Sequence, residues 1–411
     1  MRAELLTIGS ELISGATVNT NAAYLARRLA ELGLPCQRQT AVSDERSSLL
    51  AALREALSRT EVLITTGGLG PTFDDLTMEV IAEATQRPLR YRAEAAATIR
   101  RFYSRRHRKL QRAALRQALL PEGGRPLPNP LGTAPGLWLA LPECLLIALP
   151  GVPREMQAIM ERSVVPNLKR LPGLQPVVTR TLRTVGVVEL EIERCLRRLR
   201  IPDGLAIGLY PHLRAVDVRL TASLPSRPAA QRAVMRIERA LRRALGAAVY
   251  GTGEETLEEV NAALLVTHRK TLAVAESCTG GLVTDRLTNV PGSSRYLRGT
   301  VVAYHNDLKR GCLGVSADTL ARYGAVSPNV ASAMARGIRQ MAGSDVGLSV
   351  TGIAGPTGAT VKKPVGLIFL GLADRRGVKT LRCQFFGDRA SIKMQATQTA
   401  LDWLRRSLLR L

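Results

Sequence analysis

The sequence is poor in aromatic and acidic residues. Aromatic residues make up 4% of the 411 residues, so the cores must be built mainly from Leu, Ala, Val and Ile. No apolar run approaches the roughly 20 residues of a membrane-spanning helix. The segment after Met1 also lacks the apolar region of a signal peptide. We therefore expect a cytoplasmic protein with no membrane partner.

Paired cysteines are missing as well. The spacing of the six cysteines includes no C-x-x-C motif, which argues against a zinc site and against a disulfide framework and fits a reducing cytoplasm. A chain of this length is too long for one core, so two or three domains are expected. The cysteines are Cys36, Cys144, Cys195, Cys278, Cys312 and Cys383.

Positive charge is in excess, with 58 Lys and Arg against 34 Asp and Glu and a formal net charge of +24. Most of the excess is Arg, clustered at residues 100–109 and 236–243. One interpretation is a surface for nucleic acid or phosphate-bearing substrates. The favoured one is Arg on solvent-facing helix positions, because the basic residues recur at helical spacing around Val234, Ile237 and Leu241. Few aromatic residues are interleaved to stack on bases.

Residues 1–170 alternate strand-like and helix-like segments. Buried strands are predicted at 4–8, 62–66 and 145–149, each followed by Gly or Pro-Gly, and a helix is predicted at 21–32. This alternation is typical of an α/β domain with a doubly wound, mostly parallel sheet. Ligands of such sheets bind at the carboxyl ends of the strands.

Two further domains are predicted. Residues 171–252 show strands at 177–185 and 216–220, a helix at 189–199 and an Arg-rich helix after the second strand, which indicates a small α+β domain. It contains no G-x-x-G loop, so a spacer is favoured over a nucleic-acid clamp. Residues 253–411 predict a third, α/β domain with buried strands at 271–275 and 346–350, a hairpin through 374–377 and a long final helix.

The third domain contains a candidate nucleophile and base. Ser277 stands between the strand at 271–275 and the pair Gly280-Gly281, where a strand-to-helix turn can expose a hydroxyl. Lys309 could take its proton if burial lowered the lysine pKa. The alternatives are that Ser277 caps a helix and that Lys309 is a solvated surface residue. Cys278 is a weaker rival, because no His or other thiolate stabiliser is near it in sequence.

Many motifs occur in one order along the chain, and they resemble those of the competence/damage-inducible CinA family over essentially all 411 residues. In the first domain they are Gly9 to Leu12 with Gly15 and Thr20-Asn21, Thr66 to Thr72 with Asp74 to Thr77, Asn129 with Gly132 to Gly136, and Leu149 to Pro153. In the third they are Ala275 to Gly281, Gly292 to Ser294, Tyr304-x-Asn306-x-x-Lys309, Gly324 to Ser327, Thr351 to Pro356 with Lys363 to Gly366, and Gly387 to Arg389.

The resemblance implies three parts: a MoaB/MogA-like (molybdopterin-binding-like) domain at 1–170, a KH-like domain at 171–252 and a nicotinamide mononucleotide (NMN) amidohydrolase-like domain at 253–411. It implies a Ser277/Lys309 pair, no cofactor for the last domain, and a homodimer. Tyr304 would relay a proton or orient Lys309, and amides at 279–281 would receive the oxyanion or the phosphate. The expected substrate-binding residues are Cys278, Thr279, Gly280, Gly281, Ser294, Asn306, Thr351, Gly352 and Arg389.

A second site is expected in the first domain. The loop 67–72 is a candidate phosphate nest. Asp74 and Asp75 could bind a divalent cation such as Mg²⁺, or Asp74 could cap the next helix. The resemblance implies that this domain hydrolyses the pyrophosphate of ADP-ribose or binds a pterin nucleotide. Asn19 stands where the family often has Asp, which weakens the case for the pyrophosphatase. The expected nucleotide-site residues are Glu11, Asn21, Gly67, Gly68, Gly70 and Thr72.

The chain departs from the family pattern in one loop. Thr357 stands where the family commonly has Asp, and Ala359 stands where it commonly has Gly. Val361-Lys362 take the place of an acidic pair, and outside this loop His305 takes the place of a small residue. These changes bear on substrate affinity rather than on the Ser277/Lys309 pair. Two other functions stay open: a nucleic-acid-associated competence or damage protein, and a scaffold that binds nucleotides without turning them over.

Overall fold

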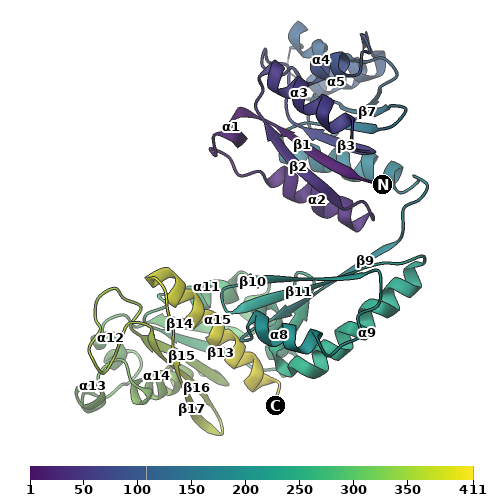
Figure 1. The fold of residues 1–411 in the computed structure, drawn as a ribbon. Coiled ribbons are helices and arrows are strands. Elements are labelled where there is room, and N and C mark those ends of the chain that lie inside the picture. Colours follow the sequence, from purple (N-terminus) through teal and green to yellow (C-terminus); the bar gives the residue numbers. More distant parts are fainter. Residues whose placement is uncertain (108, 411) are drawn as a thin grey trace. The chain divides into compact units, whose positions relative to one another are not determined.

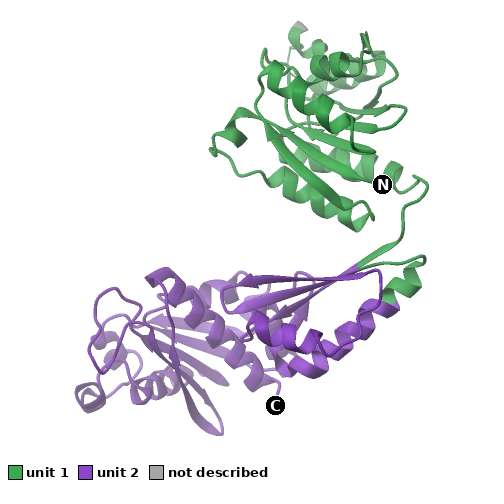
Figure 2. Ribbon diagram, viewed as in Figure 1, with its two compact units in different colours: residues 1–178, 222–231 green, residues 179–221, 232–411 purple. Residues whose placement is uncertain are grey.

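The computed structural model describes residues 1–107 and 109–410. Arg108, a member of the basic cluster at 100–109, and Leu411 lie outside the described residues. Two compact units are present (Figure 2): residues 1–178 with 222–231, and residues 179–221 with 232–411. Figure 1 labels the elements of both. No helix in the described part of the chain is long and apolar enough to cross a membrane.

The first unit is built on one six-stranded sheet. Its strands are β1 (Ala3–Ile8), β2 (Cys36–Val42), β3 (Val62–Thr66), β6 (Arg125–Leu127), β7 (Gly136–Ala140) and β8 (Leu145–Leu149), with a separate pair of β4 (Leu89–Tyr91) and β5 (Leu119–Pro121). Its helices are α1 (Ser10–Ile13), α2 (Thr20–Glu31), α3 (Arg46–Leu57), α4 (Thr77–Ala84), α5 (Ala93–Arg105), η1 (Arg112–Ala118), α6 (Pro153–Ile159), η2 (Met160–Val164) and α7 (Val165–Leu168).

The sheet order is β2-β1-β3-β8-β7-β6, parallel through β8 and antiparallel beyond it. Successive residues of β1 face opposite sides, so Leu6 and Ile8 pack on one core while Ala3 and Leu5 pack on another. Helices α3, α4 and α5 contribute to the first core, and α2, α6 and α7 to the second. Helices on both faces confirm the predicted doubly wound α/β domain.

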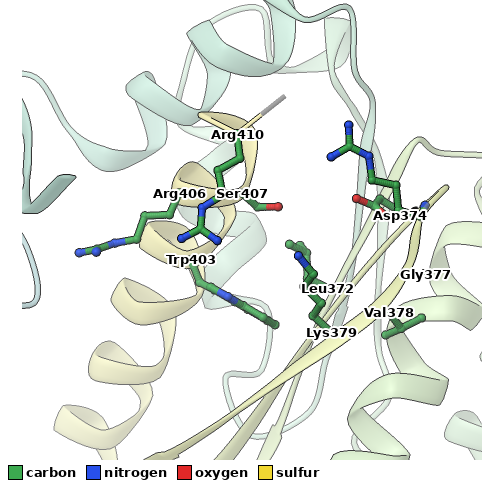
Figure 3. A pocket seen from close by; sticks show the side chains of 10 residues that line it. Leu372, Asp374, Gly377, Val378, Lys379, Trp403, Arg406, Ser407 and Arg410 are labelled. Carbon is green, nitrogen blue, oxygen red and sulfur yellow. Dashed lines mark hydrogen bonds between the residues drawn. The ribbon is translucent and has the colours of Figure 1, made fainter.

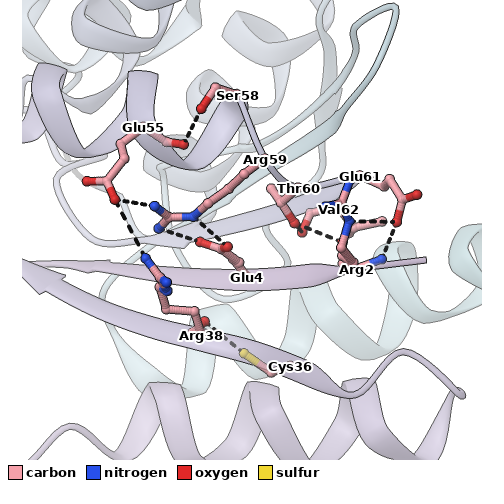
Figure 4. A network of polar contacts seen from close by, with 10 residues as sticks. All are labelled: Arg2, Glu4, Cys36, Arg38, Glu55, Ser58, Arg59, Thr60, Glu61 and Val62. Carbon is pink, nitrogen blue, oxygen red and sulfur yellow. Dashed lines mark hydrogen bonds and ion pairs between the residues drawn. The ribbon is translucent and has the colours of Figure 1, made fainter.

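A polar network lies at the start of β1 (Figure 4). Glu4 is buried, and its two carboxylate oxygens accept hydrogen bonds from Arg59 at 2.8 and 2.9 Å. Arg59 also pairs with Glu55, which lies 3.6 Å from Arg38. The bidentate pairing compensates a carboxylate that would otherwise be buried without a partner. It ties β1, β2 and α3 together at the sheet end opposite the strand ends that bind ligands in such folds.

The second unit contains two sheets. Its strands are β9 (Val177–Thr184), β10 (Leu205–His212), β11 (Ala215–Ser223), β12 (Val249–Thr252), β13 (Leu272–Glu276), β14 (Leu297–Val302), β15 (Val346–Gly352), β16 (Leu367–Asp374) and β17 (Gly377–Gln384). Its helices are α8 (Glu189–Leu196), α9 (Arg227–Leu245), η3 (Gly246–Ala248), α10 (Leu257–Thr267), α11 (Leu282–Thr288), η4 (Ser293–Arg295), α12 (Asn306–Gly311), α13 (Ala317–Tyr323), α14 (Pro328–Met341) and α15 (Arg389–Leu408). The first residues of β9 and α9 and the last of β11 belong to the first unit.

The smaller sheet has the order β10-β11-β9-β12. Val234, Ile237 and Leu241 of α9 are buried, while Arg236, Arg239 and Arg243 are exposed. The Arg residues of this helix therefore lie on its solvent face, as the favoured interpretation of the charge expects. Strand β10 was not predicted, because it contains Gly208 and Pro211, residues that disfavour a central strand. Its place at the sheet edge tolerates the proline. Helix α8 ends at Leu196 rather than at the predicted residue 199.

The larger sheet carries the candidate catalytic residues. Its order is β14-β13-β15-β16-β17, in which β14, β13 and β15 are parallel and the predicted β16–β17 hairpin is antiparallel. Helices α10, α11 and α15 pack on one face, and α14 packs on the other. Helix α15 runs along the sheet (Figure 1). This layering brings the carboxyl ends of β13 and β15 next to the first turns of α11 and α15.

Candidate active site

Ser277 directly follows β13, a strand whose five residues are all buried. Its N–H donates to the carbonyl of Val350 on β15 at 2.9 Å, which fixes Ser277 at the carboxyl ends of two parallel strands. Gly280 and Gly281 then turn the chain into α11 with φ of +64° and +97°, a region that favours glycine. Gly281 is the N-cap residue of α11 and has no side chain with which to cap it. Ser277 is therefore not the helix cap considered above.

A buried carboxylate holds this turn in shape. Glu276 accepts hydrogen bonds from the N–H groups of Gly281 at 2.9 Å and Thr284 at 2.9 Å, from the Thr284 hydroxyl at 2.7 Å, and from the N–H of Val283 at 3.2 Å. It thus satisfies amides of the first turn of α11, where a negative charge is also favoured by the helix dipole. Sequence reasoning missed Glu276, although an acidic residue ending a buried strand before Gly-Gly was a usable signal.

Lys309 reaches Ser277 from α12. Its Nζ lies 3.2 Å from Ser277 Oγ, 2.7 Å from the carbonyl of Ala303 and 3.4 Å from the carbonyl of Tyr304. The side chain is only 2% exposed, so Lys309 is not the solvated residue of the alternative interpretation. Burial lowers its pKa from the usual lysine value, because removal from water disfavours the charged amine.

The contacts of Lys309 suit an uncharged amine. A neutral amine has two N–H donors and one lone pair, whereas an ammonium has three donors. The two main-chain carbonyls of Ala303 and Tyr304 can accept both N–H groups. In the neutral amine the lone pair then remains for the hydroxyl proton of Ser277, whereas in the ammonium the third N–H donates to Ser277 Oγ. The pair has the arrangement that a nucleophile and its general base require.

Tyr304 contacts Lys309 through its main chain and not through its phenol. Its side chain is 60% exposed, and its hydroxyl accepts a hydrogen bond from Arg389. Arg389 also donates to the carbonyl of Gly355 at 2.6 Å. The expectation that the phenol relays a proton to Lys309 is therefore wrong for this conformation. The ring instead positions the Arg389 guanidinium beside the loop that follows β15.

The oxyanion donors differ in part from those expected. The Gly280 N–H bonds to the carbonyl of Ser277 at 3.1 Å, and the Gly281 N–H bonds to Glu276. Within the described residues, the amides of Cys278 and Thr279 have no such acceptor. They are the available donors next to Ser277 for a developing oxyanion. Burial raises the pKa of the Cys278 thiol to about 12, so this cysteine is not a thiolate at neutral pH.

Two expected substrate contacts at β15 serve the fold. Thr351 is buried and its hydroxyl donates to the carbonyl of Ala325 at 2.8 Å. The proton of that hydroxyl is therefore used within the fold, and contact of a ligand with the main-chain amides of this loop stays a prediction. Gly352 has packing neighbours that a side chain would clash with, since a Cβ there would lie 2.2 Å from Ile368 Cδ1. Both residues shape the floor beside Ser277.

Ser294 is far from Ser277, contrary to expectation. It lies on η4, directly before β14, and the first residue of β14 pairs with Leu272 at the start of β13. Ser277 follows the other end of β13, roughly 15 Å away at the usual rise per strand residue. Because β13 and β14 are parallel, a segment that precedes β14 lies at the wrong sheet edge. Asn306, by contrast, is exposed at the start of α12, one turn before Lys309.

A second cation that the sequence analysis missed lies beside the turn. Lys393 is half-buried on α15, one turn after Arg389, and its Nζ lies 3.6 Å from the position that a Gly280 Cβ would occupy. In the described part of the chain its ammonium has neither an ion pair nor a hydrogen-bond acceptor. A half-buried ammonium without a partner is a ready anion-binding group. The usable signal was the i, i+4 spacing of two basic residues after the Gly387-Asp388-Arg389 motif.

The first unit has a pocket of about 100 Å³ at the carboxyl ends of β1 and β3. Glu11, Asn21 and Thr66 line it. Asn21 donates from Nδ2 to the carbonyl of Gly151 at 2.7 Å, while its buried Oδ1 has no hydrogen-bond partner among the described residues. A buried acceptor left unpaired is costly, so it marks a position where a ligand donor would be favoured.

The glycine loop after β3 does not line this pocket: Thr66 does, but the expected residues Gly67 and Gly68 do not. Gly67 has φ of +117°, and a Cβ there would lie 2.1 Å from the carbonyl of Ile8, so only glycine fits. Gly68 also has positive φ. The expected residues Gly70 and Thr72 do not line the pocket. Thr72 instead donates its N–H to Asp75 Oδ2 at 2.9 Å, which braces the loop.

The expected cation site is incomplete. Asp75 is engaged by Thr72, and Asp74 is exposed and does not cap α4, whose N-cap position is Leu76 without a side-chain bond. No group of three or more His, Cys, Asp or Glu suited to a metal occurs among the described residues. Of the two aspartates that could bind a divalent cation here, Asp75 is already engaged by Thr72, so a bound cation would need further ligands.

Comparisons with known proteins place the whole chain. Family models match residues 4–170 (probable molybdopterin binding domain), 179–251 (damage-inducible protein CinA KH domain) and 254–408 (CinA C-terminal domain). The CinA-like protein of Dictyoglomus thermophilum is 42% identical over 413 residues, which is 100% of both chains. The chain belongs to the CinA family.

Further proteins are similar to this chain. The CinA-like protein of Gemmatimonas aurantiaca is 43% identical over 416 residues, covering 100% of this chain and 97% of its own length. A solved structure of CinA from Thermoplasma acidophilum is 37% identical, with a TM-score of 0.38, over 41% of this chain and 97% of that chain. The departures of this CinA-family chain at 357–362 fall on the exposed loop between β15 and β16.

We predict that Glu276→Ala destabilises the second unit by on the order of 3 kcal/mol, because several buried or half-buried donors lose a charged acceptor. Denaturant unfolding followed by hydrogen exchange at residues 281–284 measures this. Glu259→Ala is the matched control, since Glu259 caps α10 at an exposed position and its loss should amount to about 1 kcal/mol or less. Equal losses in the two variants would contradict the role given to Glu276.

Proposed function

We propose that the second unit hydrolyses the amide of NMN to nicotinic acid mononucleotide and ammonia. The observation that supports this most is the 3.2 Å contact between Ser277 Oγ and the buried Nζ of Lys309, whose pKa burial lowers. A carboxamide is resonance-stabilised, so its hydrolysis needs an activated nucleophile and stabilisation of the oxyanion. Both are available at the carboxyl ends of β13 and β15.

The proposed first step is acylation. The neutral Lys309 amine takes the hydroxyl proton of Ser277, and Oγ attacks the carboxamide carbon. The carbonyl oxygen becomes an oxyanion that accepts hydrogen bonds from the Cys278 and Thr279 amides. The Lys309 ammonium then returns the proton to the amide nitrogen, the C–N bond breaks, and ammonia leaves. An ester between Ser277 and the nicotinoyl group remains.

The second step is deacylation. Lys309, again neutral, accepts a proton from a water molecule that attacks the ester carbonyl. The C–O bond to Ser277 breaks, Lys309 returns its proton to Oγ, and nicotinic acid mononucleotide is released. The same two side chains therefore serve both halves of the reaction. No metal or organic cofactor enters either step.

The phosphate of the substrate is assigned to α15. Arg389 and Lys393 lie one helical turn apart, on the same side of the helix and in its first two turns. Lys393 has its ammonium near Gly280, and Arg389 is held by Tyr304 and Gly355. Two cations near a helix N-terminus suit a phosphate dianion. This placement favours a nucleotide over an uncharged amide.

We also propose that the pocket of the first unit binds a nucleotide such as ADP-ribose. The supporting observation is the buried, unpaired Oδ1 of Asn21 beside the glycine turn at Gly67 and Gly68. Hydrolysis of the pyrophosphate in this pocket would need a cation that the two aspartates could hold only with ligands from substrate and water. Binding is therefore the better supported half of that expectation.

We expect Ser277→Ala to lower kcat for NMN at least about 10³-fold, because the nucleophile is lost. Ammonia release by the purified full chain measures it. Ser316→Ala is the control, since Ser316 caps α13 outside the site. Turnover of Ser277→Ala at the wild-type rate would remove the proposal.

The pH dependence should report Lys309. Its folded-state pKa is lowered, and only the neutral amine is a base, so kcat/KM should rise with pH and level off below the usual lysine pKa of about 10.4. Lys309→Arg should be inactive across this range, because a guanidinium stays protonated. A pH-rate profile measures both. A Lys309→Arg variant with the wild-type profile would exclude Lys309 as the base.

Lys393→Met should raise KM for NMN about tenfold or more, because a charge-assisted contact with the phosphate is lost. Hydrolysis of nicotinamide riboside, which lacks the phosphate, should not change. Lys169→Met, at an exposed position of the first unit, controls for the lost charge. Equal effects on the two substrates would show that Lys393 does not contact phosphate.

Asn21→Ala should weaken binding of ADP-ribose about tenfold, since the ligand would lose a buried acceptor. Isothermal titration of the full chain measures the affinity. Asn167→Ala, which removes an amide bonded locally to Ser163, is the matched control. An Asn21→Ala variant that binds as tightly as wild type would rule out this pocket as the nucleotide site.

A further inference from the structure

A second cavity of the larger sheet lies away from Ser277. It has a volume of about 260 Å³ and is enclosed by the β16–β17 hairpin and the last turns of α15. Figure 3 shows the side chains of these two elements facing each other across it. Ala373, next to the hairpin turn, pairs with Gly347 at the start of β15, whereas Ser277 bonds to Val350 toward its end. The two sites therefore occupy opposite ends of the sheet.

The walls of this cavity carry uncompensated positive charge. Arg376, Lys379 and Arg410 line it and are exposed. Within the described residues, none of the three has an acidic partner within 4.0 Å. The lining includes one acidic residue, Asp374, and its Oδ1 accepts the main-chain N–H of Arg376 at 2.7 Å. Three unpaired cations converging on one concavity focus a field that attracts an anion.

A fourth lining cation shows the contrast. Arg406 Nε lies 2.7 Å from Asp402 Oδ2, so its charge is compensated within α15. In the smaller neighbouring cavity, Lys270 is likewise paired with Asp345 at 3.3 Å. Arg339 and Arg375, which line the smaller cavity, have no acidic partner within 4.0 Å among the described residues, so pairing is not general at this end of the sheet. The three cations of the larger cavity are distinguished instead by lining one concavity together with Trp403.

One aromatic ring forms part of the cavity wall. Trp403 of α15 is half-buried and packs against the core of the second unit. In Figure 3 its indole lies opposite Leu372 and Lys379. A fixed aromatic ring is a stacking surface for a planar heterocycle. Any nucleobase can stack on it, because every base has a π-face. The aromatic fraction of this chain is only 4%, so a Trp placed in a cationic cavity is not a common surface feature here.

We propose that this cavity is a nucleotide-binding site separate from the active site. The phosphates contact Arg376, Lys379 and Arg410, and the base stacks on Trp403. Neither a bare phosphate nor an uncharged heterocycle uses both features. The volume of about 260 Å³ is near the lower end for small-molecule pockets, which suits a mononucleotide. The proposal does not depend on the amidohydrolase reaction.

Helix α15 joins this cavity to the active site. Its first turns carry Arg389 and Lys393 beside Ser277, and its last turns carry Trp403 and Arg410. A nucleotide bound at one end therefore contacts the same helix that contacts substrate at the other. A nucleotide bound in this cavity would therefore act as an effector of the second unit. Its binding can be measured without measuring the reaction at Ser277.

The test uses the fluorescence of Trp403. The chain has two tryptophans, so the full chain with Trp138→Phe leaves Trp403 as the only reporter. Titration with AMP should change its emission saturably and more weakly at high salt. The double variant Arg376→Gln/Arg410→Gln should weaken this binding about tenfold or more. Arg298→Gln, an exposed residue on the opposite edge strand β14, should leave it unchanged.

Three further titrations decide the ligand class. Adenosine and inorganic phosphate should each bind more weakly than AMP, since each lacks one of the two contacts. Phosphate that binds as tightly as AMP would overturn the role of Trp403. An acidic peptide that binds more tightly than AMP would overturn the proposal of a nucleotide ligand and would indicate that the cavity binds a protein segment. No saturable change with AMP, or equal binding by the double variant, would overturn the site itself.

Discussion

The site depends on one buried amine that has no carboxylate within 4.0 Å in the described part of the chain. Lys309 contacts two main-chain carbonyls and the hydroxyl of Ser277, and desolvation is the main influence on its pKa. A carboxylate partner would stabilise the ammonium and remove the base at neutral pH. The carbonyls of Ala303 and Tyr304 orient the amine without charging it. The proposed basicity of Lys309 therefore follows from its burial, from its two carbonyl contacts and from the lack of a carboxylate beside it.

The larger sheet supplies this environment through its parallel strands. The N–H of Ser277 is anchored to β15, the N–H of Ala303 is anchored to the carbonyl of Glu276 at 2.8 Å, and α12 then returns Lys309 to the same strand ends. Glu276 fixes the turn on the other side. Since the nucleophile, the base and the amides all sit on rigid elements, little reorganisation is needed when substrate binds. In the proposed function, the two cations on α15 select for an anionic substrate.

Much of this could be predicted from the sequence, but not all. Strand endings at Gly9, Gly67 and Ser277 revealed the parallel sheets, because buried strands followed by turns leave a local signal. The location of Ser294 could not be predicted, since only the strand order shows which sheet edge a segment joins. The position of Lys393 beside Gly280 likewise depends on tertiary packing. The carboxylate of Glu276, by contrast, bonds to residues 281–284 of the turn that follows it and could have been found from the sequence. The homodimer and the cytoplasmic location expected from the sequence stay predictions.

The central claim is that Lys309 is neutral beside Ser277 at working pH. Labelling the lysine side chains with ¹⁵N or ¹³C and titrating the resonance of Lys309, assigned through Lys309→Arg, measures this directly. The account predicts a midpoint clearly below the usual lysine value of about 10.4, while the exposed Lys169 titrates near that value. A Lys309 resonance that titrates together with Lys169 would contradict the account, because the amine would then be protonated when Ser277 has to lose its proton.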